Sequence, residues 1–331
     1  MEYYGTLGPS CQDPETLKKM LAAGMTGLRL NLSHGSLPGQ ASLLAAWHKA
    51  QEEAGVQGEL LIDLEGPELR TGVIPRPFPL IEGSNVLLGP GGIPVPDFLP
   101  PLLSPDQVLL LDDGKLLLKV TQTGDSSVSC LVIRGGILRS RKSLALKNPA
   151  ACGIHLPALT ENDRKNLAAA SEFRVTGVML PFVRGQADLL ELKRALADAG
   201  ASGIRIFAKL ENQEGLQHLK ELFSDSDMIV IARGDLGNCL PLWELPRAQK
   251  ETAACCQKSG VPFLVVTQML DSMQNRPVPT RAEVLDIFNA VLDGASALML
   301  TGETAVGPVS YTHLDVYKRQ GSPNERKNTD R

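Results

Sequence analysis

The chain has 331 residues, of which 43% are hydrophobic, and its formal net charge is −4 at pH 7. This apolar content can bury a large core, either as one α/β domain or as two domains. The acidic balance and the absence of a long run of lysine and arginine argue against a nucleic-acid partner or an anionic membrane surface.

The cysteines and the N-terminus indicate a reducing, cytoplasmic setting. The six cysteines form no C-x-x-C pair and show no metal-ligand spacing, and the adjacent Cys255 and Cys256 are poorly placed to bridge each other. Residues 1–4 lack the basic start of a signal peptide, and no stretch reaches the roughly 18 apolar residues that a membrane span needs. We therefore predict a cytoplasmic protein with no membrane segment.

Short apolar runs alternate with amphipathic segments, which is the pattern of strand followed by helix. Strands are expected at 3–7, 27–32, 59–63, 177–181, 204–210, 228–232, 262–267 and 297–301. Helices are expected near 14–23, 38–54, 160–173, 186–199, 213–223, 242–259 and 281–293. Asp13-Pro14 is a helix-start signal, and residues 160–163 and 280–283 have the form of capping boxes. Eight such repeats predict a closed (β/α)8 TIM barrel, with an open doubly wound sheet as the alternative.

An insertion at residues 74–146 interrupts the repeat after the third strand. Prolines cluster at its start, and short β-like runs follow at 108–111, 115–121 and 127–133. Residues 112–114, Asp-Asp-Gly, predict a tight hairpin turn between two of these runs. We predict a small all-β domain at 74–146 inserted into a barrel formed by 1–73 and 147–308. Because it leaves from the C-terminal end of a strand, it is placed to act as a lid.

Residues 309–331 do not continue the repeat. The eighth helix should begin after Gly307, but residues 309–320 have no amphipathic repeat and residues 321–331 contain no large apolar residue. We expect a barrel that lacks its last helix, followed by a tail that resembles translated cloning sequence. A natural disordered tail is the alternative.

Polar residues gather where the expected strands end, which is where barrel enzymes hold their active sites. Arg29, Asn31 and Ser33 share one face of the second strand, because side chains alternate with a period of two. Lys209 and Glu211 share a face of the fifth strand, so that a cation stands beside a ligand for a divalent metal. A lone Lys-x-Glu on a strand is more often a surface pair, a lone Gly-Asp-Leu-Gly is more often a turn, and a lone Thr-Arg-Ala-Glu is more often a helix cap. Their convergence at one end of a barrel favours a catalytic site.

Ordered motifs across residues 3–307 resemble those of the pyruvate kinase family. They are TLGPS at 6–10, RLNLSHG at 29–35, GPELRTG at 66–72, DDG at 112–114, KLEN at 209–212, ARGDLG at 232–237, TQML at 267–270, PTRAE at 279–283 and GETA at 302–305. The resemblance implies that the family's C-terminal regulatory domain is absent from this chain. It also implies that the parent protein is a homo-oligomer, a tetramer in this family.

The resemblance implies glycolytic phosphoryl transfer between phosphoenolpyruvate and ADP, which yields pyruvate and ATP. Lys209, with Arg29 and Thr267, would act in catalysis, and Lys209 would neutralise the transferring phosphoryl group. Glu211 and Asp235 would bind Mg²⁺ or Mn²⁺. The substrate carboxylate would bind to the backbone at Gly234 and Asp235 and to the side chain of Thr267.

The same resemblance implies a K⁺ site and a nucleotide site. The K⁺ site would consist of Asn31, Ser33, Asp63 and the carbonyl of Leu64. The nucleotide phosphates would face Arg29, His34, Arg70 and Lys142. Glu68 stands where K⁺-dependent members of the family carry glutamate and other members carry lysine, so we predict activation by K⁺.

Departures from the family pattern indicate a divergent member. Leu64-Glu65 stands where Thr-Lys is usual, which reverses a charge beside the expected site. Val266, Phe288 and Thr301 replace commoner alanine, alanine and serine, and the segment before His155 does not follow the usual motif.

Two other functions account for part of this pattern. An aldolase of the citrate-lyase type would also bind a metal-bound enolate through Glu211 and Asp235, but it has no use for nucleotide-facing arginines or a lid. An inactive fragment that binds phosphorylated metabolites is opposed by the presence of Lys209 with both carboxylates. A P-loop is disfavoured, since no G-x-x-x-x-G-K-[ST] motif occurs.

Overall fold

The computed structural model describes residues 1–33, 35–112, 114–146 and 156–307, which form two compact units. The first unit contains Met1–Gly66, Ala158–Leu236 and the chain from Trp243, and the second contains Pro67–Pro157 and Gly237–Leu242. Both ends of the insertion predicted at 74–146 fall within the second unit. The tail at 309–331 and His155 lie outside the described residues.

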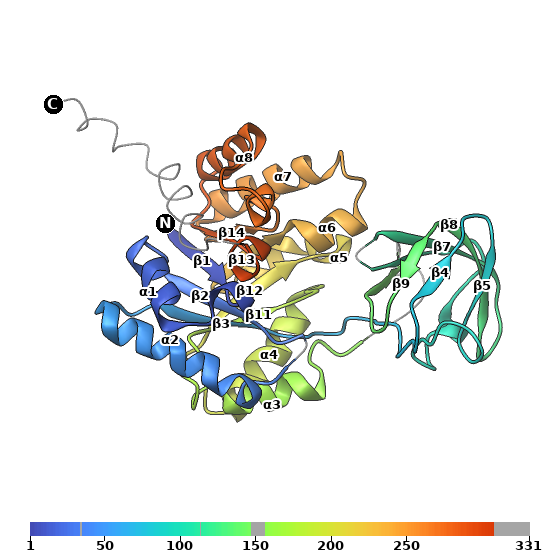
Figure 1. Cartoon of the computed structure of the whole chain (residues 1–331), viewed down its shortest axis with the longest axis horizontal. Coiled ribbons are helices and arrows are strands. Elements are labelled where there is room, and N and C mark those ends of the chain that lie inside the picture. The colour runs from blue at the N-terminus through green and yellow to red at the C-terminus, as the bar shows by residue number, and fades with distance from the viewer. Residues whose placement is uncertain (34, 113, 147–155, 308–331) are drawn as a thin grey trace. The chain divides into compact units, whose positions relative to one another are not determined.

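The first unit is the predicted closed barrel of eight parallel strands (Figure 1). Around the barrel they follow the order β1 (Glu2–Thr6), β15 (Ala297–Met299), β14 (Phe263–Val266), β13 (Met228–Ala232), β12 (Arg205–Leu210), β11 (Gly177–Leu180), β3 (Glu59–Asp63) and β2 (Gly27–Asn31). β1 pairs with both β15 and β2, so the sheet closes on itself and has no free edge. The open-sheet alternative is therefore wrong.

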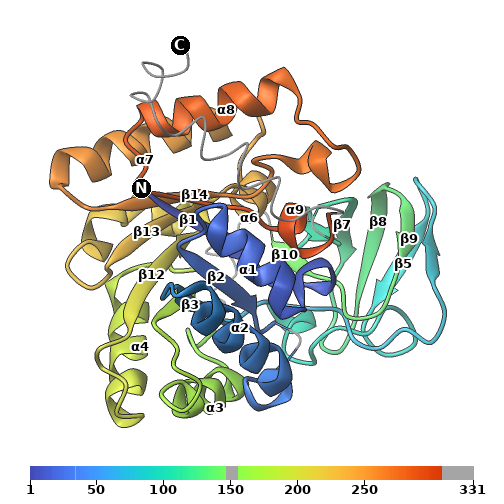
Figure 2. The same cartoon turned by 60° about the vertical axis from the view of Figure 1, so that its left-hand side comes forward.

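Helices accompany the barrel strands, and their bounds are α1 (Pro14–Ala22), α2 (Ala41–Ala54), α3 (Glu161–Ala169), α4 (Gln186–Asp198), α5 (Gln213–Gln217), α7 (Leu245–Ser259) and α8 (Arg281–Leu292). Of these, α1, α3 and α8 begin at the predicted signals. Asp13 caps α1 by accepting a hydrogen bond from the Thr16 N–H, and both predicted capping boxes form, at Thr160 and Thr280. α1 and α2 pack side by side against the barrel (Figure 2). No helix in the described part of the chain is long and apolar enough to span a membrane.

Two short helices follow strand ends directly and were not predicted. α6 (Arg233–Cys239) begins at the residue after β13, and α9 (Gly302–Ala305) follows β15. The description ends two residues after α9, so the predicted absence of an eighth long helix concerns residues outside the described part of the chain.

Large apolar side chains fill the inside of the barrel, which makes it a packed core and not a pore. The Tyr4 and Phe207 rings meet edge to face, with centroids 6.2 Å apart. The other members of this core are Leu61, Met179, Met228, Val230, Ala232, Leu264, Val266, Ala297 and Met299.

An ionic cluster closes the N-terminal end of the barrel, and we call it the bottom cluster: Glu2, Tyr4, Glu59 and Arg205. The Tyr4 hydroxyl lies 2.8 Å from Glu2 Oε2 and also within hydrogen-bonding distance of Glu59, so its single proton is shared between the two carboxylates. Arg205 Nη1 donates to Glu59 Oε1 at 2.7 Å and to Glu2 Oε1 at 3.3 Å. Every charged member therefore has a partner within the cluster, as expected for the stabilising face of a barrel.

The second unit is all β, as predicted for the insertion. Its strands are β4 (Phe78–Leu80), β5 (Asn85–Leu88), β6 (Val108–Leu111), β7 (Leu116–Gln122), β8 (Val128–Arg134), β9 (Gly136–Leu138) and β10 (Leu144–Leu146). They form an antiparallel sheet in the order β10-β6-β7-β8-β5 and a β4-β9 pair. The three predicted runs correspond to β6, β7 and β8, and Asp112 and Gly114 have positive φ at the predicted turn. The other four strands were missed because three or four residues show too little alternation.

Candidate active site

Four charged side chains meet at the C-terminal ends of β2, β3 and β12, and we call Arg29, Asp63, Lys209 and Glu211 the top cluster. Arg29 donates to Asp63 Oδ2 from Nη2 at 2.6 Å and from Nε at 2.9 Å. Lys209 Nζ lies 3.1 Å from both oxygens of Asp63 and 2.9 Å from Glu211 Oε1. Asp63 therefore holds two cations, and Lys209 bridges two carboxylates.

Strand period and sheet register explain this meeting. Lys209 and Glu211 are two residues apart, so they leave the chain on the same side, as predicted. The parallel pairing of β2 with β3 sets Asn31 opposite Asp63, which brings the end of β2 beside the end of β3. The side chains of Lys209, Asp63 and Glu211 are only 12%, 3% and 1% exposed, so their charges interact with little screening by water.

Burial and mutual charge shift the pKa values of the top cluster in opposite directions. Burial alone would lower the pKa of Lys209, but Asp63 and Glu211 raise it above its ordinary value. Burial alone would raise the pKa of Asp63, but Lys209 and Arg29 lower it. Burial raises the pKa of Glu211 to about 7, assisted by the charges of Asp235 and Asp63 and opposed by Lys209.

The carboxylates of Glu211 and Asp235 lie close enough to repel each other. Asp235 raises the pKa of Glu211 through its charge, while the second oxygen of Glu211 accepts a hydrogen bond from the Phe182 N–H at 2.8 Å. No group of three or more His, Cys, Asp or Glu side chains in the described ranges is arranged to hold a metal ion. Two carboxylates suit Mg²⁺, which keeps waters and substrate oxygens as its other ligands.

The loop after β14 meets the first turn of α6. A Cβ added to Gly234 would lie 3.2 Å from Cγ2 of Thr267, so the two predicted substrate-binding residues are neighbours. Thr267 has φ of 79° and Gln268 has φ of 54°, both in the left-handed region that a β-branched residue such as threonine rarely adopts.

The residues predicted to hold K⁺ lie at the ends of β2 and β3. Asn31 Oδ1 accepts hydrogen bonds from the Ser33 N–H at 2.9 Å and from the Ser33 hydroxyl at 2.7 Å. Asp63 lies opposite Asn31 in the sheet register, and the buried Leu64 follows Asp63 directly. Three of the four predicted ligands therefore come from two paired strand ends, and the fourth, Ser33, is hydrogen-bonded to Asn31.

Asp163, the third residue of α3 and part of its capping box, also fixes the backbone after β3. Asp163 accepts hydrogen bonds from the Glu65 N–H at 2.8 Å and the Gly66 N–H at 3.0 Å. The side chain of Glu65 reaches Asn162 Nδ2 at 3.5 Å. The reversed charge at this position is therefore directed toward α3.

Two predicted nucleotide-binding residues belong to the second unit, and each has an acidic partner there. Arg70 pairs with Glu68 at 2.6 Å and donates to the Arg141 carbonyl at 2.9 Å. Lys142 Nζ lies 2.7 Å from Asp112 Oδ1. His34, the remaining predicted residue, lies outside the described residues, whereas Arg29 belongs to the top cluster.

Several residues at this end of the barrel have no role in the sequence prediction. The Thr6 hydroxyl accepts a hydrogen bond from Arg29 at 3.3 Å. The buried Glu303 accepts hydrogen bonds from the backbone of Leu270 at 3.0 Å and of Thr301 at 2.7 Å, which ties the ends of β14 and β15 together. Thr6 and Glu303 belong to the family motifs given above, so the sequence could have indicated a role for them. Phe182, whose backbone N–H binds Glu211, belongs to none of these motifs.

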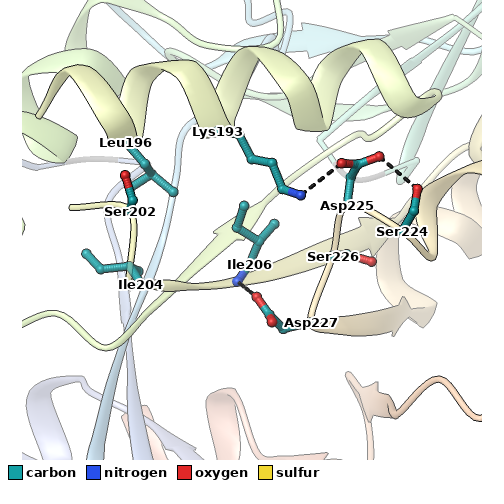
Figure 3. Close-up of a pocket in the computed structure, with 9 residues that line it drawn as sticks. All are labelled: Lys193, Leu196, Ser202, Ile204, Ile206, Ser224, Asp225, Ser226 and Asp227. Carbon is teal, nitrogen blue, oxygen red and sulfur yellow. Dashed lines mark hydrogen bonds and ion pairs between the residues drawn. The ribbon is translucent and has the colours of Figure 1, made fainter. Parts of the chain in front are cut away.

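A cavity of about 360 Å³ lies elsewhere on the first unit (Figure 3). Its lining comes from α4 and from the segments that lead into β12 and β13, at the opposite ends of these strands from the top cluster. Lys193 and Asp225 pair at 2.8 Å across it, and Asp227 accepts a hydrogen bond from the Ile206 N–H at 2.7 Å (Figure 3). Lys193, Asp225 and Asp227 on the cavity lining therefore all have protein partners.

Fold and site together define a class: a (β/α)8-barrel protein whose C-terminal end carries buried cations and carboxylates suited to an anionic, metal-bound ligand. The chain belongs to the pyruvate kinase family, since the model of the pyruvate kinase barrel domain matches residues 2–89 and 97–313.

Individual relatives agree with this assignment. A pyruvate kinase of Sporosarcina psychrophila is 35% identical over 317 residues, covering 91% of this chain and 53% of the relative. A pyruvate kinase of Aeropyrum pernix is 37% identical over 306 residues, covering 91% of this chain and 66% of the relative. A crystal structure of a pyruvate kinase from Cryptosporidium parvum matches with a TM-score of 0.89 and 31% identity, covering 97% of this chain and 68% of that one. The chain thus spans about half to two thirds of the length of these curated relatives.

Proposed function

We propose that this barrel transfers a phosphoryl group between phosphoenolpyruvate and ADP, in the direction that yields pyruvate and ATP in glycolysis. The observation that carries the proposal is the buried top cluster, in which Lys209 stands between Asp63 and Glu211. In the reaction the bond from phosphorus to the enolate oxygen breaks and a bond to the terminal oxygen of ADP forms. The enolate then takes up a proton to become pyruvate.

Lys209 and Arg29 supply the positive charge for this transfer. Both are largely buried, with side chains 12% and 13% exposed, so their attraction for a phosphoryl group is weakly screened. The raised pKa of Lys209 keeps it charged across the physiological range. Its contacts with Asp63 and Glu211 fix the position of the ammonium group before substrate arrives.

Glu211 and Asp235 fit a divalent cation. Their mutual repulsion, which helps to raise the pKa of Glu211, is relieved when a cation is shared between them. Mg²⁺ or Mn²⁺ bound there would neutralise charge on the oxygens of the substrate. The carboxylate of the substrate would lie against the backbone N–H groups of Gly234 and Asp235 and the hydroxyl of Thr267.

The oxygens at the ends of β2 and β3 fit a monovalent cation. Asn31, Ser33 and Asp63 offer an amide, a hydroxyl and a carboxylate oxygen, and Leu64 offers its carbonyl. Glu68 supplies no positive charge of its own, which supports dependence on K⁺. We expect activity to fall when K⁺ is replaced by a tetraalkylammonium ion, and equal activity in both salts would contradict this part of the proposal.

Family membership supports the remaining parts of the proposal. Arg29, Arg70, Lys142 and His34 would bind the nucleotide phosphates, the second unit would act as the lid, the parent protein would assemble as a homo-oligomer, and it would act in the cytoplasm. The aldolase alternative does not account for Arg29 beside Lys209.

A coupled assay for pyruvate tests the proposed function. The chain is supplied with phosphoenolpyruvate, ADP, Mg²⁺ and K⁺, and pyruvate is measured through its reduction to lactate. We expect pyruvate formation that requires ADP and is lost in Lys209→Met. Pyruvate release without ADP, or activity that survives this substitution, would overturn the proposal. Calorimetric titration with phosphoenolpyruvate and Mg²⁺ shows whether an inactive preparation still binds the substrate.

A further inference from the structure

Arg233, the first residue of α6, is hydrogen-bonded to the loop that follows β14. Its guanidinium donates to the Thr267 carbonyl from Nη2 at 2.6 Å and from Nε at 3.1 Å, and to the Gln268 carbonyl at 3.2 Å. Nη1 donates to Asp286 on α8 at 2.6 Å. The side chain is only 11% exposed, so these charge-assisted hydrogen bonds are well shielded from water.

The loop after β14 has a strained backbone. Thr267 and Gln268 are consecutive residues with positive φ, and neither is glycine. Such conformations cost free energy and persist only when neighbouring structure imposes them. The two carbonyls that Arg233 holds belong to these same two residues, so its hydrogen bonds are available only while the loop keeps this conformation.

The position of Arg233 in the chain joins this loop to α6. Gly234 follows Arg233 directly, and the side chain of Thr267 lies against it, within 3.2 Å of where a Cβ on Gly234 would stand. We propose that Arg233 is a positioning residue that holds Thr267 in a left-handed conformation and thereby sets its hydroxyl against the first turn of α6. The inference rests on the proposed function only in naming the carboxylate of phosphoenolpyruvate as the group that this arrangement receives.

The shape of the guanidinium is essential to this role. Arginine presents several N–H groups in a planar fork, and three of its nitrogens here serve two carbonyls and a carboxylate. A lysine could keep the ion pair with Asp286 but could not also satisfy both loop carbonyls. Arg233→Lys therefore removes the clamp and preserves the charge.

A double-mutant cycle tests the clamp without any assay of activity. Glycine adopts positive φ without strain, so Gln268→Gly should raise the urea midpoint of unfolding. Arg233→Lys should lower the midpoint, and by clearly more in the Gln268→Gly background, because the Gln268 loop regains its strain energy when the clamp is lost whereas a glycine loop has none to regain. The matched control is Lys250→Gln, which breaks a 2.7 Å ion pair between α7 and Asp293 at the end of α8. Its loss should be equal in both backgrounds. A loss for Arg233→Lys that is also equal in both backgrounds would overturn the clamp.

Steady-state kinetics test what the clamp positions. In Arg233→Lys we expect KM for phosphoenolpyruvate to rise about tenfold while KM for ADP changes by less than about twofold, because only the carboxylate contact is displaced. Lys250→Gln should change neither KM. Equal rises in both KM values, or no rise in either, would overturn the positioning role. If the unsubstituted chain turns over no phosphoenolpyruvate, the proposed function and the substrate part of this inference fail together, while the urea cycle still decides whether Arg233 imposes the conformation.

Discussion

The two ends of the barrel carry ionic clusters built on the same strands. β3 begins with Glu59 in the bottom cluster and ends with Asp63 in the top cluster. β12 begins with Arg205 and carries Lys209 four residues later, on the same face of the strand. In both clusters a cation from β12 pairs with a carboxylate from β3, at 2.7 Å in the bottom cluster and 3.1 Å in the top cluster.

The clusters differ in burial and in how their charges are used. Arg205 and Glu59 are 29% and 28% exposed, whereas Lys209 and Asp63 are 12% and 3% exposed. In the bottom cluster burial and the nearby carboxylates raise the pKa of Tyr4, so its hydroxyl stays a donor. In the top cluster Glu211 is buried beside further negative charge, and its pKa is raised to about 7. Every charged member of the bottom cluster is bonded within the cluster, whereas Glu211 of the top cluster also faces the charge of Asp235, which suits a shared cation.

The largest expected difference is catalytic. Lys209→Met should lower kcat by about 10³-fold or more, since it removes the cation proposed to neutralise the transferring group. Arg205→Met, the same change on the same face of β12, should leave kcat within about twofold. The coupled pyruvate assay measures both. Comparable losses in the two variants would mean that the clusters are not functionally distinct.

The next effect concerns pH and divalent cations. Because the raised pKa of Glu211 favours its protonated form, metal binding should weaken by about tenfold per pH unit as pH falls below about 7. In the metal-free chain the same shift makes folding less stable as pH rises from the ordinary value of 4.5 through about 7, and added Mn²⁺ should restore this stability.

The effect is measured by titrating Mn²⁺ binding between about pH 5.5 and about pH 8.5. This range of about three units brackets the pKa of Glu211. Glu211→Gln should bind Mn²⁺ weakly at every pH and should lose the pH dependence. A Glu211→Gln variant that keeps the dependence of the unsubstituted chain would assign it to another group.

We expect the bottom cluster to contribute to the free energy of unfolding and not to catalysis. Arg205→Met leaves Glu2 and Glu59 without their cation and should lower the free energy of unfolding by about 1–2 kcal/mol. KM for both substrates should stay unchanged, because the cluster lies at the other end of the strands. Urea unfolding and steady-state kinetics on the same preparation check both points. A shifted KM would contradict the separation of the two ends.

The smallest effect is expected at the Lys193–Asp225 pair, which also lies at the bottom of the barrel. Hydrogen bonds from Lys193 and Gln186 lower the pKa of Asp225 to about 2. Its stabilising contribution is therefore present above the ordinary value of 3.8 and is lost as pH falls toward about 2. Lys193→Gln should cost less than about 1 kcal/mol at neutral pH, because exposed pairs contribute little. Urea unfolding at pH 7 and pH 3 measures it, and a larger cost would mean that the cavity in Figure 3 depends on this pair.

Much of the barrel could be predicted from the sequence because its signals are local. The eight apolar runs became the eight barrel strands, and Thr160 and Thr280 cap the helices that they were expected to cap. The short strands β4, β5, β9 and β10 were missed, and so was α6, whose two glycines favoured a loop. Only partners from elsewhere in the chain stabilise such elements.

The sequence by itself determined the barrel and the pairing of Lys209 with Glu211, since the period of a strand sets both. Tertiary structure decided the rest of the top cluster. Asp63 bonds Arg29 and Lys209, which lie 34 and 146 residues away, because barrel closure and strand register bring three strand ends together. It also decided that Arg233, a residue with no role in the sequence analysis, meets two left-handed residues of another loop. Strand periodicity acts over two residues, whereas these contacts depend on where parallel strands end in space.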